Sequence, residues 1–493
     1  MKQGINAAGR GRPAAGSKGS ESLPAIFAQA LATLRSEHFP TSEPAIAVAL
    51  SGGLDSMVLL RLAHAYARAQ GLALFAFHVH HGLSPNADAW REHCARACAG
   101  LGIRFDAREV SIEKGKSGIE AAARKGRYAA LGDMCRAHGA GLLLTAHHLD
   151  DQAETVLLQL LRGSGPAGLS GMDAANRAPT LLGDEHLVMA RPLLQASRAV
   201  LEAFAREQGI AWVEDESNSD PRYARNALRH TVMPALAQAF PGFQQRVARS
   251  SMHAQSALRV LTEVADQDLD ACLDGDAVDL NKLGALSPDR INNVLRHWFS
   301  LRRLAMPSTA WMDEMIAQLF EARADAQLLV THPDCHVRRH RERLYLVPKL
   351  PDLAGMRDPD DEGIIDKHAQ RFRWTGEASL AFPDYGGVLH FDAAGEGASG
   401  LDPAWLRAQE LEIDFRKGGE KLKLASNRPS RSLKAHFQAH GIPAWERTRL
   451  PIVSAGIGLL YAAGLGMDCR CLSEGAGRIV LRWASDPAPD APA

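Results

Sequence analysis

The sequence predicts an α/β protein: a doubly wound parallel sheet, followed by a helical linker domain and a small α+β C-terminal domain. Between residues 44 and 191, short apolar runs without polar alternation are separated by stretches of helical periodicity. Strands of this kind belong to parallel sheets that are covered on both faces. After residue 234 the apolar runs give way to helical patterns rich in Ala, Leu, Arg and Gln, and the length of 493 residues suits about three domains.

Five apolar runs are the expected strands of the first domain. They comprise residues 45–50, 72–80, 105–110, 141–147 and 186–194. The stretches between them carry apolar residues at helical spacing, at residues 56–69, 87–102, 118–139 and 150–162. Ligands of doubly wound sheets bind at the carboxyl ends of the strands, so the residues that follow each run are the candidates for a functional site.

Changes in composition divide the chain into six segments. In order, we expect a disordered or loosely ordered N-terminal extension, a catalytic domain, a mainly helical middle domain, a β-rich connecting segment, a C-terminal domain and a disordered tail. Their expected bounds are residues 1–40, 41–234, 235–349, 350–404, 405–483 and 484–493.

Composition limits the cellular compartment and the classes of binding partner that we expect. The net charge is −1, so a nucleic-acid surface must be a local basic patch. The seven cysteines are an odd number in a large chain, which indicates a reducing compartment rather than a disulfide framework. No apolar run reaches the roughly 18 residues of a membrane helix, and the first twenty residues lack the apolar core of a secretory signal. We therefore expect a cytoplasmic protein without a membrane partner.

The first apolar run ends in the string SGGLDS, residues 51–56. Glycines allow a sharp turn and the close approach of a ligand, and the helix start that follows offers free N–H groups to an anion. The hydroxyls of Ser51 and Ser56 can add hydrogen bonds to phosphate oxygens. Asp55 would repel a phosphate unless a magnesium ion lies between them. A plain glycine turn with Asp55 as a helix cap is the structural alternative.

A second polar cluster follows the fourth run, where His147 precedes Asp150, Asp151 and Glu154. The helix dipole favours acidic residues in a first turn, so capping alone would explain Asp150. Because the whole cluster lies at the carboxyl end of another strand, we favour a functional role. His147 would contact a nucleotide, and Asp151 would hold magnesium or a substrate amine.

Zinc binding is the rival interpretation of the histidines in these two regions. It would use His78, His80, His81, His147 and His148, but no cysteine pair or His-x-x-x-His spacing accompanies them.

Two further groups place cations on helical faces. Arg124 and Arg127 are three residues apart, and Arg225, Asn226 and Arg229 share one face of a later helix. Such arginines usually solvate a surface. Near a triphosphate they could stabilise the charge that develops on a leaving pyrophosphate.

Taken together, these stretches resemble the tRNA(Ile)-lysidine synthases, a family of the PP-loop N-type ATP pyrophosphatases. The string at 51–56 is similar to the family's nucleotide loop, and the likeness covers about residues 44–235 and 410–470. It includes HVHHGLSPNAD (78–88), RPLL (191–194), DESNSDPRYARN (215–226), FRKGGEKLKL (415–424) and SLKAHFQAHGIPAWERTRLP (432–451).

The resemblance implies an adenine nucleotide alpha-hydrolase-like fold and a specific reaction. Cytosine O2 of the wobble cytidine in a CAU-anticodon tRNA(Ile) attacks the α-phosphate of ATP, and pyrophosphate leaves. The ε-amine of free L-lysine then attacks C2, AMP leaves, and lysidine changes codon reading from AUG to AUA. ATP and Mg²⁺ are the implied cofactors. The oligomeric state is left open, with a homodimer as one candidate.

Site residues follow from matching these motifs. The expected nucleotide-binding residues are Ser51, Gly52, Gly53, Leu54, Asp55, Ser56 and His147, and Asp55 is the expected magnesium ligand. The expected catalytic residues are Asp55, Arg127, Asp151 and Arg225. The candidates for contacts with lysine or tRNA are Arg124, Asp150, Glu154, Asn226, Arg229, Lys421, Arg431, Lys434 and Arg447.

A basic segment near the C-terminus is the expected tRNA surface. Between residues 415 and 451, basic residues far outnumber acidic ones, and Phe437 and Trp445 lie among them. A local basic patch in a neutral chain suits phosphate-backbone binding, although a solvated charged face has the same composition. The family likeness favours tRNA.

Two other functions remain open from the sequence. A tRNA thiolation enzyme of the same loop family would need reactive cysteines, usually as Cys-x-x-Cys, but Cys94 and Cys98 are four apart and Cys469 and Cys471 only two. A non-catalytic tRNA-binding protein would not need the intact SGGLDS string.

Overall fold

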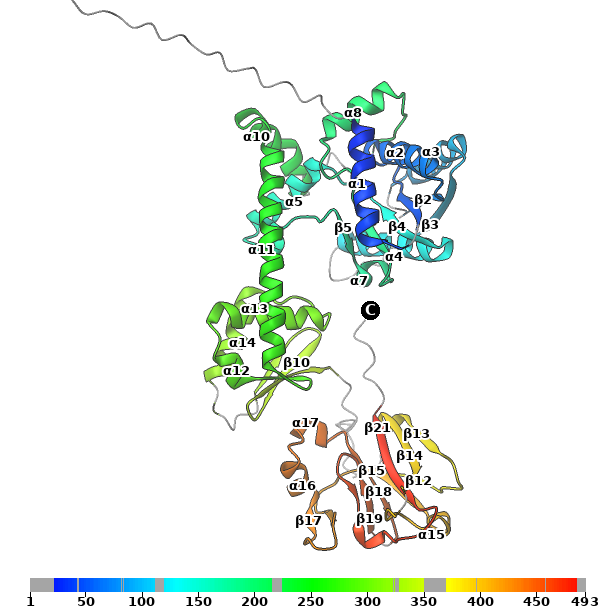
Figure 1. Ribbon diagram of the computed structural model, residues 1–493, viewed down its shortest axis with the longest axis vertical. Helices are drawn as coiled ribbons and strands as arrows, with labels where there is room; N and C mark the ends of the chain where they lie inside the picture. Colours follow the sequence, from blue (N-terminus) through cyan, green and yellow to red (C-terminus); the bar gives the residue numbers. More distant parts are fainter. Residues whose placement is uncertain are drawn as a thin grey trace, which may run out of the picture. The chain divides into compact units, whose positions relative to one another are not determined.

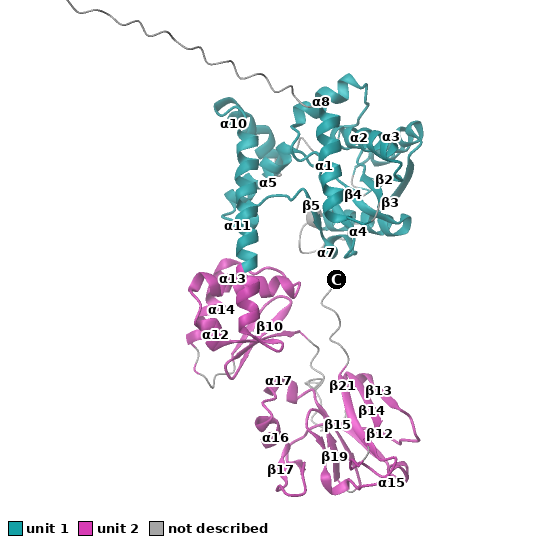
Figure 2. Cartoon of the chain, in the orientation of Figure 1, with its two compact units in different colours: residues 1–263, 493 teal, residues 264–492 magenta. Residues whose placement is uncertain are grey.

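The computed structural model describes residues 22–41, 44–80, 82, 84–110, 119–214, 224–321, 323, 328–349, 369–395, 397–456 and 458–485. The chain forms two compact units, which Figure 2 colours separately. The first comprises residues 1–263 with residue 493, and the second residues 264–492.

A six-stranded sheet of order β3-β2-β1-β4-β6-β5 forms the centre of the first unit (Figure 1). All of its pairings are parallel except that of β5 with β6. Each expected apolar run contributes a strand, so the predicted doubly wound sheet is confirmed, and only the antiparallel edge strand β5 was not expected. The strands are β1 (Ala45–Ala49), β2 (Leu74–His80), β3 (Arg104–Glu109), β4 (Ala140–Leu144), β5 (Ala175–Arg177) and β6 (Val188–Ala190).

Helices cover both faces of this sheet. One face buries Val48 with Val58 and Leu201 of helices α2 and α8, and the other buries Ala47 with Tyr128 of helix α4. This two-sided burial explains why the strands read as continuous apolar runs. The helices are α1 (Leu23–His38), α2 (Leu54–Gln70), α3 (Ala87–Leu101), α4 (Ile119–His138), α5 (Leu149–Leu161), α6 (Pro166–Leu169), α7 (Pro179–Leu182) and α8 (Arg198–Glu207).

The expectation of a loosely ordered segment over residues 1–40 is wrong for residues 23–38. These form α1, which buries Leu23, Phe27, Leu31 and Leu34 in the core shared with α2 and α8. Apolar side chains at spacings of three and four are a helix signal. Residues 1–21, and the tail from residue 486, lie outside the described part of the chain.

The first unit continues in a helical run that carries two of the candidate arginines. It comprises α9 (Ala224–Ala227), the π-helix η2 (Leu228–Val232), α10 (Met233–Ala239) and the long α11 (Phe243–Cys272), of which residues 243–263 belong to this unit and the rest to the second. Arg225 lies on α9 and Arg229 on η2. π-Helical turns are rare and occur preferentially at functional sites.

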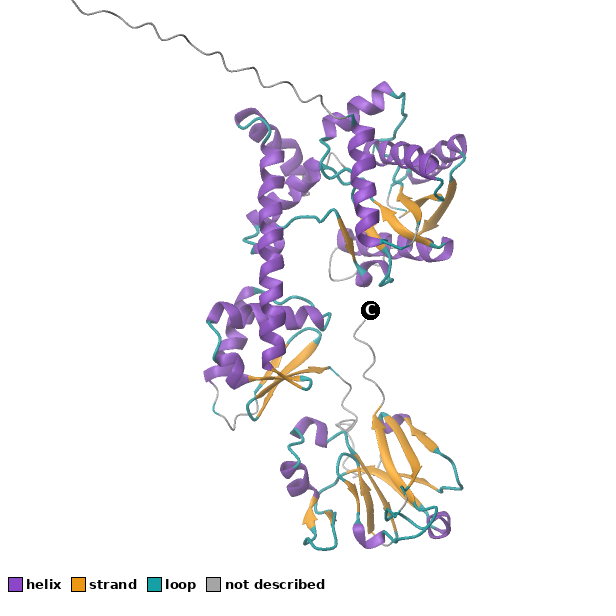
Figure 3. Ribbon diagram, in the orientation of Figure 1, coloured by secondary structure: helices purple, strands orange, loops and turns teal. Residues whose placement is uncertain are grey.

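The second unit begins with helices that pack on a five-stranded sheet (Figure 3). The helices are α12 (Leu280–Gly284), α13 (Pro288–Leu301) and α14 (Thr309–Glu321). The sheet has the order β7-β8-β11-β10-β9, with β7 (Leu273–Asp274), β8 (Ala277–Asp279), β9 (Leu329–Thr331), β10 (Cys335–His340) and β11 (Arg343–Pro348). The helical periodicity of this region was visible in the sequence, but the sheet was not.

Three antiparallel sheets, of orders β12-β15-β18-β19-β20, β13-β14-β21 and β16-β17, and several short helices form the rest of the second unit. The expected connecting segment at 350–404 is not a connector where it is described, because β12 pairs with β15 and β14 pairs with β21. Its strands thus belong to the C-terminal sheets. The strands are β12 (Gln370–Phe372), β13 (Ser379–Phe382), β14 (Gly387–Ala393), β15 (Leu411–Phe415), β16 (Lys421–Leu422), β17 (Arg431–Ser432), β18 (Pro451–Ala455), β19 (Gly458–Ala462), β20 (Gly466–Met467) and β21 (Ile479–Ser485). Short helices are η3 (Pro383–Tyr385), α15 (Pro403–Ala408), α16 (Leu433–Ala439), α17 (Ala444–Arg447) and η4 (Cys469–Cys471).

Candidate active site

The turn between β1 and α2 has no room for a side chain at Gly52. Its φ is +90°, and a Cβ there would lie 3.1 Å from Val213 Cγ2 and 3.2 Å from Cys94 Sγ. The Val213 N–H also donates to the Gly52 carbonyl at 3.0 Å. The segment after α8 therefore packs against the turn, and the positive φ together with these short distances favours glycine at this position.

Ser51 and Ser56 form hydrogen bonds within the turn. The Ser56 hydroxyl accepts from the Gly52 N–H at 3.1 Å and donates to the Gly53 carbonyl at 2.9 Å, and Ser51 Oγ lies 3.1 Å from it. Gly53 is the N-cap of α2 and provides no side-chain cap, and Leu54 opens the helix. The start of α2 is thus suited to an external anion.

Asp55 presents an unpaired carboxylate oxygen at this turn. Its Oδ1 is buried without a hydrogen-bond partner, whereas Oδ2 lies 3.7 Å from His148 Nε2. A buried carboxylate oxygen without a donor is costly unless a cation completes it. Since no group of three or more Asp, Glu, His or Cys in the described part of the chain could hold a metal by itself, a cation here would take its other ligands from phosphate and water.

His148 joins the turn to the second cluster. It caps α5, where its Nδ1 accepts from the Asp151 N–H at 3.4 Å and its own N–H donates to Asp151 Oδ2 at 3.2 Å. Burial lowers the pKa of His148, but the close contact with Asp55 and the negative charges of Asp151 and Asp150 outweigh burial, so its pKa is raised. One imidazole thereby links the acids of α2 and α5.

Arg225 and Arg229 lie on the acidic face of α5. Asp151 Oδ1 accepts from Nη2 of Arg225 at 3.0 Å and of Arg229 at 2.9 Å. Glu154, which is 1% exposed, accepts from Arg225 Nε at 2.8 Å and from Arg229 Nε at 2.5 Å. Burial favours the neutral form of Asp151, but the charges of His148, Arg225, His147 and Arg229 prevail and lower its pKa. The structure thus joins candidate residues from two distant motifs in one ionic cluster.

Asp150 lies at the edge of this cluster, with Oδ2 at 3.7 Å from His148 Nδ1, and also bonds to neighbouring helices. Its Oδ2 accepts from the Arg198 N–H at 2.8 Å at the start of α8, and its Oδ1 accepts from Gln244 Nε2 of α11 at 3.4 Å. The capping interpretation of Asp150 thus has direct support, although the helix that it caps is α8 rather than its own.

His147 is a neutral side chain near several cations. Its Nδ1 lies 3.0 Å from Thr145 Oγ1. Burial, opposed by Asp151 and assisted by Arg191, Arg225 and Arg124, lowers its pKa to about 3. At neutral pH its imidazole is therefore uncharged and can form a hydrogen bond as a neutral group.

Arg124 and Arg127 are both exposed on α4 and lie over the ring of Tyr128, with centroid distances of 4.9 and 5.2 Å.

The sequence analysis did not single out Arg191, a buried residue near this site. Its Nη1 donates to the Asp173 carbonyl at 2.8 Å and to Asn176 Oδ1 at 2.7 Å. Its sequence signals were its place directly after a buried strand and at the start of the RPLL stretch (191–194).

The competing chemistries find little support in the described residues. His78 Nδ1 bonds the Leu50 carbonyl at 2.9 Å instead of facing a metal, and His81 lies outside the described part. Burial raises the pKa of Cys94 and of Cys98 to about 12. Such thiols are poor nucleophiles, which disfavours thiolation through them.

The basic C-terminal candidates divide into two groups. Lys421, Arg431 and Lys434 are exposed on β16, β17 and α16, whereas Arg447 is half-buried and donates from Nε to the Ile442 carbonyl at 2.7 Å. Asn226 is half-buried on α9.

The two C-terminal aromatic residues do not form an open stacking surface. Phe437 is fully buried in a core with Leu422 and Leu433, so the expectation that it lies among the basic residues is wrong. Trp445 packs edge-on against Tyr345, with ring centroids 5.7 Å apart. Its indole therefore serves packing within the second unit.

The parallel sheet and its first strand–helix turn define the class of PP-loop proteins, and the family model described as a PP-loop domain matches residues 24–236. Two further models match, the TilS substrate binding domain at residues 279–345 and the TilS substrate C-terminal domain at residues 411–483. The chain belongs to the tRNA(Ile)-lysidine synthase family.

Curated relatives extend over most of the chain. A tRNA(Ile)-lysidine synthase of Ralstonia nicotianae is 42% identical over 439 residues, which cover 88% of this chain and 91% of the relative. Those of Burkholderia pseudomallei and Alkalilimnicola ehrlichii are 41% and 40% identical and cover 90% and 88% of this chain, and 93% and 92% of their own lengths. Among the described helices, none is long and apolar enough to cross a membrane.

Proposed function

We propose that the protein ligates free L-lysine to C2 of the wobble cytidine of a CAU-anticodon tRNA(Ile), with release of AMP and pyrophosphate. The product lysidine would change codon reading from AUG to AUA. Family membership over both the PP-loop region and the two TilS regions supports this activity. The observation that carries the proposal is the turn itself, where Gly52 has a φ of +90° in close packing and Asp55 Oδ1 is buried without a partner.

In the first step, cytosine O2 attacks the α-phosphate of ATP. The amide-like carbonyl oxygen is a poor leaving group. Its adenylation makes it part of AMP, which is a good leaving group. The uncapped start of α2 and the Ser51 hydroxyl bind the departing pyrophosphate. Neutral His147 contacts the nucleotide, and the exposed Arg124 and Arg127 stabilise the developing charge.

Magnesium is the expected partner of Asp55 in this step. The unpartnered Oδ1 fits a cation that is shared with phosphate oxygens. When bound, Mg²⁺ would offset the negative charge of the leaving pyrophosphate.

In the second step, the ε-amine of lysine attacks C2 and AMP leaves. The lowered pKa of Asp151 keeps it ionised, so it can bind the ammonium group of lysine. The Asp150/Asp151 pair takes the proton that the amine must lose. Arg225 and Arg229, which pair with Asp151 and Glu154, are the candidates for stabilising the α-phosphate.

Incubation with ATP, Mg²⁺, radiolabelled lysine and CAU-anticodon tRNA tests this function. The expected result is RNA-bound label that depends on ATP. Asp55→Asn should abolish it while Asp88→Asn, at an exposed position on α3, should retain it. Failure of the wild-type protein to label RNA, with ATP turned over normally, would refute the proposed substrate pair.

A further inference from the structure

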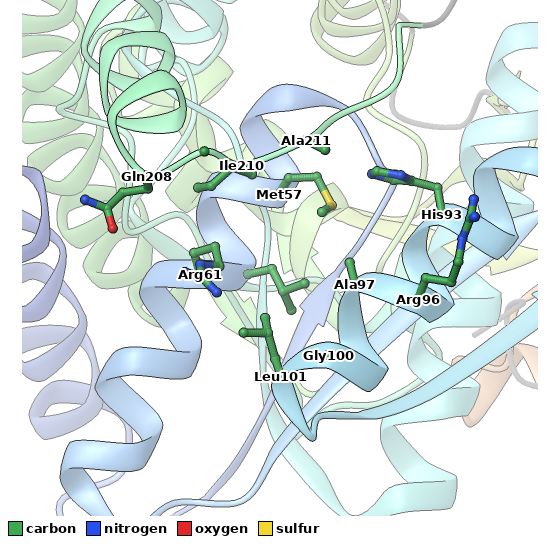
Figure 4. Close-up of a pocket in the computed structure, with 12 residues that line it drawn as sticks. Met57, Arg61, His93, Arg96, Ala97, Gly100, Leu101, Gln208, Ile210 and Ala211 are labelled. Atoms are coloured by element: carbon green, nitrogen blue, oxygen red, sulfur yellow. The ribbon is translucent and has the colours of Figure 1, made fainter.

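A pocket of about 410 Å³ lies beside the turn at Gly52, outside the cluster described above. Helices α2 and α3 and the segment after α8 line it (Figure 4). Its volume lies in the range of small-molecule sites. Met57, Leu60, Leu101 and Ile210 give it an apolar floor.

The charged side chains that line the pocket are positive. Arg61 of α2 and Arg96 of α3 flank the hollow from opposite sides in Figure 4, and no Asp or Glu lines it. Neither arginine has a hydrogen bond or ion pair within the described residues, whereas Arg91 on the same helix α3 pairs with Asp88 and Glu109. Two guanidinium groups left free around an apolar floor suit a ligand with an anionic group and a flat or apolar body.

His93 supplies an independent indication of a ligand. Its Nε2 is buried and has no hydrogen-bond partner. Figure 4 shows its ring projecting from α3 toward the segment at Ala211. A buried imidazole nitrogen without a partner is costly, and a ligand group in the pocket could complete it.

We propose that this pocket binds a nucleoside monophosphate unit, either free or as part of an RNA chain. The base lies on the apolar floor, and Arg61 and Arg96 bind the phosphate. Because the ring of His93 also lies 3.8 Å from the position of a Cβ on Gly52, the occupied pocket adjoins the turn at Gly52.

Photo-crosslinking of the full chain locates this site without relying on activity. The probes are 8-azido-AMP and an azido-adenosine-labelled anticodon stem-loop RNA, and the readout is the labelled residue identified by mass spectrometry. We expect label on residues 97–101 or 208–211. The double variant Arg61→Ala/Arg96→Ala should reduce it at least tenfold, because each guanidinium–phosphate contact contributes about that factor.

The control is Arg68→Ala, an exposed arginine on α2 that does not line the pocket, which should label like the wild type. Labelling of the pocket by the mononucleotide identifies a free nucleotide as the ligand, and labelling by the RNA alone identifies an RNA nucleotide. Label confined to residues 51–56 and 145–148 with both probes, or pocket label that the double variant retains, would overturn the proposal.

Discussion

At the scale of single residues, the site depends on side chains that are absent or unpaired. Gly52 accommodates Val213 and Cys94 because it lacks a Cβ, and Asp55 keeps one carboxylate oxygen without a partner. Both features cost stability in the absence of a ligand, and a site for a phosphate and its counter-ion explains them.

Gly52→Ala tests the first of these features. A positive φ costs a non-glycine residue about 1–2 kcal/mol, and the added Cβ would also press on Val213 and Cys94. We expect a free energy of unfolding lowered by at least this amount, together with loss of ATP-dependent pyrophosphate release. Gly71→Ala, at a positive φ with open space around it, is the matched control and should lose stability but keep activity. Full activity of Gly52→Ala would contradict the proposed role of the turn.

His147 provides a test based on pH. Its folded pKa of about 3 lies below its unfolded value, so the unfolded chain binds the extra proton as the pH falls. The resulting stability is present above about pH 6.5 and is lost progressively between pH 6.5 and 3. Chemical denaturation at pH 7.5 and 5.5 should show that His147→Gln loses about 1 kcal/mol less than the wild type on acidification. Equal losses would show that His147 is not held neutral.

At the scale of elements, helix α5 is fixed by a buried polar network. Gln152, which is 3% exposed, donates from Nε2 to the Met172 carbonyl at 3.0 Å and to Ser251 Oγ of α11 at 3.1 Å, and its Oε1 accepts from the Met172 N–H at 2.8 Å. Since Gln152 lies between Asp151 and Glu154, this network sets where α5 presents its acids.

The variants Gln152→Ala, Ser251→Ala and the double form a cycle that measures this coupling. Each single variant leaves buried polar groups unsatisfied, which costs about 1–3 kcal/mol, and the double should cost less than their sum. We also expect the KM for lysine to rise while that for ATP stays constant. Gln318→Ala, at a half-buried position on α14 in the second unit, is the control. Additive stability losses with unchanged KM for lysine would refute the positioning role.

The local parts of fold and site could be predicted from the sequence, but the long-range parts could not. The turn at residues 51–56 and the acidic start of α5 are each encoded by a few consecutive residues. The pairing of Arg225 with Glu154 joins residues 71 apart in the chain, and no local pattern reveals it. Phe437 shows the same limit, because its helical spacing among basic residues gives no sign that it faces a core. The strands of the middle region were hidden for the same reason, since short β-hairpins carry a weak signal beside strong helical periodicity.

At the scale of the whole molecule, a chain of nearly zero net charge has three exposed cations on neighbouring elements of its C-terminal region. Lys421, Arg431 and Lys434 lie on the paired strands β16 and β17 and on the helix that follows them. If these three cations contact tRNA phosphates, replacing all three by alanine should weaken tRNA binding and reduce the slope of log K against log salt by about 2–3. Arg482→Ala is the control, because Arg482 is paired with Asp392. An unchanged salt slope would exclude this module from the RNA interface.

The position at which ATP is cleaved tests the central claim most directly. The turn at Gly52 is proposed to bind the β- and γ-phosphates as one leaving group. With γ-labelled ATP, tRNA and lysine, we predict label in pyrophosphate only, and one pyrophosphate per lysine joined to RNA. Label in inorganic phosphate, with ADP as the other product and pyrophosphatase excluded, would contradict the account.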